Sequence, residues 1–322
     1  MSSSVHAATA ASATLDLTRF PRRSDAVSWA VVTAHLAFVF APVYLAAAVG
    51  PSLWLVPLWL WFGAFMHGLL NLMHECAHAS TFRDRSTSDA LGHWLLGPLV
   101  FADFDGYRRR HWDHHRHFGL PADTKDAYLV DLRGPGLRAL LFRSLVLAEA
   151  VKKLRVQGGT TSASPAASAR DGSKQWLFRT ACVQAGFLLS LTVVALAANP
   201  GRPVRALVAV ALAYGFIYAH GLAALTTFVA TLRAIAEHQQ AADDRLRVGR
   251  AALRNFECGP FARLLFGAYG FAEHATHHRE PAVPSYHLPA ATALLGVDPA
   301  FAPRGGYFAR LRSLARPVAA HA

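Results

Sequence analysis

The stretch LWLVPLWLWFGAFMHGLLNLMHECAH, residues 53–78, joins an apolar run to two histidines four positions apart. Residues 53–73 contain no Asp, Glu, Lys or Arg, and about 20 apolar residues are enough for a helix to cross a bilayer. His74 and His78 follow at a spacing that places both imidazoles on one face of a helix. The stretch therefore predicts a membrane-spanning helix that leads into a candidate metal site.

Three further segments are apolar enough to cross a bilayer. They are residues 26–49, 176–198 and 204–232, with Arg179 and Arg205 near the ends of the last two. Long arginine side chains at such positions can reach the membrane surface. Breaks that contain Gly and Pro, at residues 50–52 and 199–201, separate the two spans of each pair. The sequence therefore predicts four transmembrane helices arranged as two hairpins.

The composition agrees with a membrane protein. Only 16% of the residues are charged and 53% are hydrophobic, whereas soluble domains average about 25% charged residues. The formal net charge is +12, and its distribution around the spans predicts that both termini and the long middle segment are cytoplasmic. Positive charge beside long apolar runs favours anionic lipid or an acidic protein partner over nucleic acid. The three cysteines form no CxxC pair, which argues against a cysteine-bound cluster.

The domain boundaries follow from the spans. Residues 1–25 are rich in Ala and Ser and lack the apolar run of a signal peptide. They are interpreted as a retained N-terminal tail that is disordered or lies on the surface. Residues 26–290 are predicted to form the membrane domain, and residues 291–322 a C-terminal tail.

Three histidine motifs lie outside the spans: HECAH (74–78), HWDHH (111–115) and HATHH (274–278). Spacings of three and four positions put histidines on one helix face. One ion takes about four to six ligands, so eight imidazoles suit two ions with positions left for oxygen or substrate. Imidazole binds iron, copper, zinc and nickel. The excess of imidazole over carboxylate favours a redox-active metal pair.

These motifs resemble the histidine boxes of the membrane fatty acid desaturase and hydroxylase superfamily, HxxxH, HxxHH and HxxHH. Neighbouring residues agree, since Asn71 precedes the first box, YRRR (107–110) the second, and PAVP (281–284) follows the third. The resemblance extends over about residues 70–289. Thr276 stands where the family commonly has Glu, a departure that bears on the substrate class.

The resemblance implies an all-α integral membrane fold with a cytoplasmic helical cap that holds two iron ions. It also implies a ninth imidazole, which His238 of RAIAEH (233–238) matches. The implied metal ligands are His74, His78, His111, His114, His115, His238, His274, His277 and His278. The carboxylates beside them are predicted to orient imidazoles through the second ring nitrogen. These are Glu75, Asp113, Glu237 and Glu273, with Asp123 and His117 as weaker candidates.

The resemblance implies oxidation of a C–H bond of a lipid-like substrate, with fatty acid desaturation as the leading prediction. A lipid hydroxylase or a carotenoid ketolase of the same superfamily is the first alternative. The HExxH form of the first box also fits an intramembrane zinc metalloprotease with Glu75 as general base. That reading leaves six histidines of the boxes without a role. A non-enzymatic metal transporter would place carboxylates inside the spans, and the predicted spans contain none.

The predicted oxidation needs electrons from outside the chain. The resemblance implies a separate donor, and the sequence contains neither a haem-binding HPGG motif nor a cysteine cluster. Basic residues of the predicted cytoplasmic segments favour an acidic donor such as a ferredoxin or a cytochrome. The candidates are Arg108, Arg109, Arg110, Arg116, Lys152, Lys153 and Arg155.

Overall fold

The structure is a computed structural model of the 322-residue chain. It describes residues 15–118, 120, 123, 130–159, 166–238, 253–296 and 298–316, with the backbone alone at 156–159 and 166–173. The described residues form helices and connecting segments without a β-strand, which confirms the all-α class. The first and last parts of the predicted tails, residues 1–14 and 317–322, lie outside the described residues.

Among the residues that the structure describes, four helical segments are long and apolar enough to cross a membrane, and they confirm the four predicted spans. They are α1 (Asp25–Val49), the pair α2 (Leu55–Phe65) and α3 (His67–Ala77), residues Lys174–Ala198 of α9 (Ala166–Ala198), and a composite helix, Pro203–His238. The composite helix comprises α10 (Pro203–Ala211), the π-helical segments η4 (Leu212–His220) and η5 (Leu222–Thr226), and α11 (Thr227–His238). It continues past residue 232, where the predicted span ends, to His238.

Local sequence explains both ends of α1 and the start of α10. The side chain of Ser24 accepts a hydrogen bond from the backbone N–H of Val27 and so caps the start of α1. Gly50 ends this helix with a φ of 72°, a conformation that glycine adopts without steric cost. Pro203 begins α10, where its missing N–H has no helical partner to lose.

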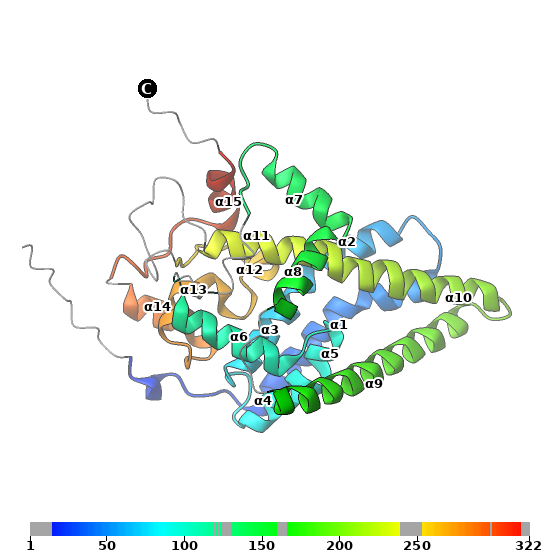
Figure 1. Cartoon of the computed structure of the whole chain (residues 1–322), viewed down its shortest axis with the longest axis horizontal. Helices are drawn as coiled ribbons and strands as arrows, with labels where there is room; N and C mark the ends of the chain where they lie inside the picture. The colour runs from blue at the N-terminus through cyan, green and yellow to red at the C-terminus, as the bar shows by residue number, and fades with distance from the viewer. Residues whose placement is uncertain are drawn as a thin grey trace, which may run out of the picture.

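The spans pack against one another around a shared apolar core. Helix α1 contacts α2, α9 and η4, and α9 contacts α10. Buried side chains from all four spans contribute to one core, among them Val39, Phe62, Leu191 and Ile217. Figure 1 shows α9 and α10 extending together to one end of the molecule, with the later helices gathered at the other.

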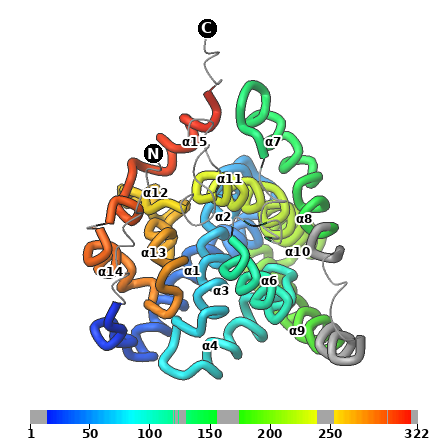
Figure 2. Tube along the Cα trace, turned by 60° about the vertical axis from the view of Figure 1, so that its left-hand side comes forward, coloured from blue at the N-terminus to red at the C-terminus, as the bar shows by residue number. Residues whose placement is uncertain are grey.

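Shorter helices form a second layer that contacts α3, α9, η5 and α11. Between the second and third spans these are α4 (Arg85–Leu91), η2 (Gly92–Leu96), α5 (Gly97–Leu99), α6 (Phe104–His117), α7 (Gly136–Leu145) and α8 (Ala148–Gly159). After α11 come α12 (Pro260–Leu265), η8 (Ala268–Glu273), α13 (His274–Arg279), η9 (Ser285–His287), α14 (Leu288–Leu295) and α15 (Tyr307–Ala315). Figure 2 shows α6 and α13 of this layer near α3, in the middle of the molecule.

The described parts of both predicted tails are packed. Near the N-terminus, which also contains the short helix η1 (Leu17–Arg19), Phe20 is buried against Val283 and Leu288. Near the C-terminus, α15 packs against α11 and buries Tyr307 completely. Apolar side chains within otherwise polar segments explain this packing, since their burial offsets the cost of ordering the chain.

Candidate metal centre

The structure brings all nine predicted histidines together in the layer beside the spans. Five imidazoles form a first group, in which the ligand atoms lie within 4.8 Å of one another: His74, His78, His111, His115 and His277. Two overlapping sets form a second group by the same criterion: His114, His238 and His278, and Glu237, His238 and His274. All of these side chains are buried. The two groups touch, because the imidazole rings of His115 and His278 stack with their centroids 4.2 Å apart.

Four helix segments supply these imidazoles. The end of α3 carries the first box, α6 the second, the last residue of α11 is His238, and α13 carries the third box. The carboxylate of Asp103 caps α6 by accepting from the backbone N–H groups of Asp105 and Gly106. Before α13, Tyr269 and Gly270 have φ angles of 55° and 76°, and this left-handed turn re-aims the chain toward the centre.

The distances between ring nitrogens suit ligands of a shared ion. Nε2 of His111 lies 2.6 Å from Nε2 of His78 and 2.9 Å from Nε2 of His115. In the second group, Nε2 of His274 and Nε2 of His238 are 3.0 Å apart. Two ligands about 2.1 Å from one ion and at right angles would stand about 3.0 Å apart. The donor set and its geometry therefore fit a metal pair of the kind that imidazole binds.

Hydrogen bonds on the other ring nitrogen orient three of the imidazoles. Nδ1 of His114 lies 2.8 Å and 3.0 Å from the two carboxylate oxygens of Asp123, and both side chains are fully buried. Nδ1 of His74 lies 3.1 Å from Glu75, and Nδ1 of His238 lies 2.9 Å from the carbonyl oxygen of Ala234. An Nδ1–H that donates to such an acceptor leaves the Nε2 lone pair for a metal.

The remaining predicted residues fall into two sets. Glu237 lies within the second group, with one carboxylate oxygen 3.6 Å from Nε2 of His274. Asp113 and Glu273 instead face arginines, at 3.6 Å from Arg116 and 2.8 Å from Arg263. Nδ1 of His117 lies 3.0 Å from the backbone carbonyl oxygen of Asp113 on the same helix.

Aromatic residues outside the sequence motifs also contact the centre, among them Phe118, whose ring centroid lies 5.3 Å from that of His114. The ring centroid of Phe271 lies 4.5 Å from that of His74, and the Arg233 guanidinium stands 4.0 Å from the Phe271 centroid. The Tyr307 hydroxyl is 2.8 Å from a carboxylate oxygen of Glu237. Burial raises the pKa of Tyr307 well above its usual value, so the hydroxyl remains a hydrogen-bond donor. Phe271 lies three positions before His274 but belongs to none of the motifs, and Tyr307 lies far along the chain from every box.

Burial also favours the neutral form of His278 in the third box. Desolvation, and then the nearby imidazoles of His274 and His115, lower the pKa of His278 well below its usual value. A neutral imidazole retains the lone pair that a metal requires. A surface cleft of about 340 Å³ reaches this imidazole and is also lined by Leu253, Ala275, Arg279, Glu280, Ala300 and Phe301.

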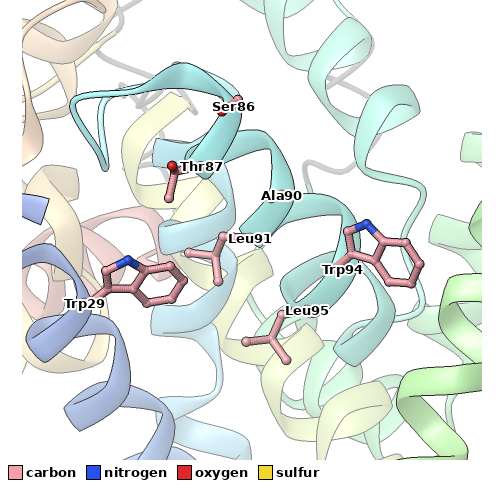
Figure 3. Close-up of a pocket in the computed structure, with 7 residues that line it drawn as sticks. All are labelled: Trp29, Ser86, Thr87, Ala90, Leu91, Trp94 and Leu95. Carbon is pink, nitrogen blue, oxygen red and sulfur yellow. The ribbon is translucent and has the colours of Figure 1, made fainter.

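A second cleft of about 340 Å³ lies apart from the metal centre. Figure 3 shows Trp29 of α1 on one side and Trp94 of η2 on the other, with Leu91 and Leu95 between them. Ser86, Thr87 and Ala90 complete a lining that includes none of the nine imidazoles. Exposed tryptophans beside a transmembrane helix are typical of the zone where lipid headgroups meet the hydrocarbon.

Comparison with known proteins agrees with the motifs. Residues 51–309 match the fatty acid desaturase family. The chain is 32% identical over 90 residues to an sn-1 oleoyl-lipid 12-desaturase of Synechocystis sp., and 31% identical over 74 residues to one of Anabaena variabilis. These alignments cover 28% and 23% of this chain, respectively. They span only 25% and 21% of the length of the two relatives.

Proposed function

The chain belongs to the fatty acid desaturase family, and from that premise we propose that it is an oxygen-dependent di-iron oxidoreductase that desaturates a lipid acyl chain. The observation that carries the proposal is the pair of adjoining imidazole groups with converging Nε2 atoms. A hydroxylase or a ketolase would use the same centre, and the relatives favour desaturation because both are oleoyl-lipid desaturases by name. The substrate that we propose is a lipid-borne acyl chain.

The two groups divide the proposed ligands between two ions. The first group would hold one iron, and His114, His238, His274 and His278 would hold the other. A bound iron pair supplies the redox chemistry by which oxygen can oxidise a C–H bond. The protein fixes the tautomers through Nδ1, and it buries all nine rings, which limits the access of water.

The position of Glu75 argues against the metalloprotease alternative. One of its oxygens lies 3.1 Å from Nδ1 of His74, the nitrogen that faces away from the converging Nε2 atoms, and the other accepts a hydrogen bond of 2.8 Å from Ser80. A general base in an HExxH site must reach a metal-bound water. Glu75 is held on the opposite side of the ligand, as expected for an orienting carboxylate.

Lipid profiling tests the proposed activity. Expression of the chain in a host that lacks its own desaturases should add unsaturated acyl chains, and the His114→Ala variant should add none above background. Gas chromatography with mass spectrometry separates the outcomes, because alkene, alcohol and ketone products differ in mass. Hydroxylated or ketone products would replace desaturation by one of the alternatives, while unchanged lipids from a well-expressed chain would contradict all three.

We further propose that the metal centre and both termini face the cytoplasm, with the two interhelical turns on the other side. The motive is the excess of Lys and Arg around the centre. With Cys182 and Cys258 replaced, Leu53→Cys in the first turn should react only with a reagent added outside. Arg85→Cys at the start of α4 should react only after permeabilisation. The side chains of Leu53 and Arg85 are 93% and 70% exposed, so the reverse pattern would contradict this topology.

An acidic electron donor is proposed to bind at α6. Arg109 and Arg116 are each 69% exposed, and on the same helix the Trp112 ring contacts the His78 imidazole at a centroid distance of 4.8 Å. These two arginines also lie 3.8 Å from Asp103 and 3.6 Å from Asp113, in pairs that remain solvent-exposed. Two other predicted docking residues are less exposed. Arg108 pairs with Asp89, and the partly buried Lys153 donates to Thr231 at 2.7 Å, with burial lowering its pKa to about 8.

Charge reversal separates donor docking from attraction to lipid. In neutral lipid, Arg109→Glu/Arg116→Glu should raise the KM for a reduced acidic ferredoxin about tenfold at low salt, and salt should erase most of the difference. Turnover at saturating donor should change little. Arg202→Glu, in the exposed turn before α10, is the control and should behave like the parent. Equal salt curves for the double variant and the parent would remove α6 as the docking surface.

A further inference from the structure

Glu237 differs from the other carboxylates of the metal centre in the ring nitrogen that it approaches. Glu75 and Asp123 each lie beside Nδ1 of an imidazole, the nitrogen behind the ligand atom. Glu237 lies 3.6 Å from Nε2 of His274, the nitrogen that faces Nε2 of His238 at 3.0 Å. Its carboxylate therefore stands on the side where an ion would bind.

The surroundings of Glu237 suit a ligand. It is fully buried at the end of α11, directly before His238. One of its carboxylate oxygens and the ligand atoms of His238 and His274 all lie within 4.8 Å of one another. Oxygen and nitrogen ligands about 2.0–2.2 Å from an ion stand about 3.0–3.5 Å apart. The distance of 3.6 Å to His274 lies close to the upper end of this range.

Tyr307 holds one oxygen of this carboxylate and leaves the other toward the imidazoles. Its hydroxyl lies 2.8 Å from Oε1 of Glu237 and also 2.8 Å from the carbonyl oxygen of Phe271. A hydroxyl has one proton, and a carboxylate is the stronger acceptor. The Tyr307 ring is fully buried and stacks on Phe256 at 4.0 Å between centroids, which fixes its position. Oε2 of Glu237 lies 3.5 Å from Nε of Arg233.

We propose that Glu237 is a carboxylate ligand of the second metal ion, and that Tyr307 is the positioning residue that sets its orientation. This inference rests on the proposed function, because it presupposes the dimetal centre. It makes the two ions chemically different: the first has only neutral imidazoles from the protein, whereas the second also has a negative oxygen. Loss of the carboxylate should therefore lower the affinity for the second ion and leave the affinity for the first unchanged.

Metal titration of the full chain tests the assignment without any turnover. Metal-free protein in detergent is titrated with ferrous iron under anaerobic conditions, against a competing chelator. The parent should bind two ions per chain. Glu237→Gln should bind the first ion with the affinity of the parent and the second ion at least about 100-fold more weakly. Tyr307→Phe should lower the affinity for the second ion about tenfold.

Glu149→Gln is the matched control. Glu149 is also a buried carboxylate paired with an arginine, Arg143, but it lies on α8 outside both imidazole groups. This variant should retain two ions at parental affinity, which separates loss of a ligand from loss of a buried ion pair.

The possible outcomes separate the inference from its premise. Two ions at parental affinity in Glu237→Gln would overturn the ligand assignment and leave the dimetal centre intact. Equal weakening of both ions would also overturn it, since a general structural defect has that signature. A parent chain that binds no iron would overturn both. Helicity and elution volume check folding. If Glu237→Gln does not fold, Tyr307→Phe takes its place. Selective loss of the second ion would then support the inference, and full retention of it would overturn the inference.

Discussion

Replacement of His111 by alanine is expected to abolish lipid oxidation and to leave at most one iron ion per chain. Nε2 of His111 lies within 3 Å of the Nε2 atoms of both His78 and His115, so its imidazole occupies the middle of the first group. Its loss removes a ligand and leaves a gap where water can enter. We expect activity to fall by more than about 100-fold, the upper end of what loss of a supporting residue costs. Elemental analysis and lipid profiling of the same preparation measure both effects.

His93→Ala is the control for this variant. His93 is a partly buried histidine of η2 that lies 3.4 Å from Asp105 and belongs to neither imidazole group. The variant should keep two ions and parental activity. Two ions bound by His111→Ala, at parental affinity, would show that the first group is not a metal site.

The second large effect is expected from Asp123→Asn. Asp123 accepts from Nδ1 of His114 with both carboxylate oxygens nearby, and neither side chain is exposed. An amide loses the charge that holds the Nδ1–H tautomer, and it can present its NH₂ group to the ring instead. We expect a 10–100-fold loss of iron affinity, which is typical when the hydrogen-bond partner of a ligating histidine is removed.

Iron supplementation gives this variant a distinctive signature. Because Asp123 is expected to act through His114, a large excess of ferrous iron should restore most of the activity of Asp123→Asn but none of that of His111→Ala. Asp105→Asn, half-exposed in the first turn of α6, should need no supplement. An Asp123→Asn protein with parental iron affinity would mean that the hydrogen bond to His114 does not tune the metal site.

The sequence predicted those parts of the molecule that depend on local pattern. Runs without charge locate the spans because a charge in hydrocarbon is costly. The spacing of the boxes places the histidines because the helical repeat is fixed. The end of the fourth span could not be read in this way. Arg233 is the first charge after the apolar run, but its guanidinium lies over the Phe271 ring, and the helix continues to His238.

The partners of the carboxylates depended on tertiary contacts and were beyond the sequence. Asp113 lies inside the second box, yet on α6 its side chain faces Arg116 at the surface. Asp123 follows α6 in the chain, and its carboxylate contacts His114. Glu237 and Glu273 both precede a predicted ligand. The structure turns Glu237 toward the centre and pairs Glu273 with Arg263. Proximity in sequence does not distinguish these cases, because one residue on a helix turns a side chain by about 100°.

The first group also sets the order in which the molecule can mature. His74 and His277 of this group are 203 positions apart in the chain. Their ring centroids lie 4.5 Å apart. Each span satisfies its own backbone in the bilayer and can form before its neighbours arrive. Contacts between distant segments form late, since the loop between them must close first. Metal loading of the proposed centre would therefore follow insertion of the fourth span.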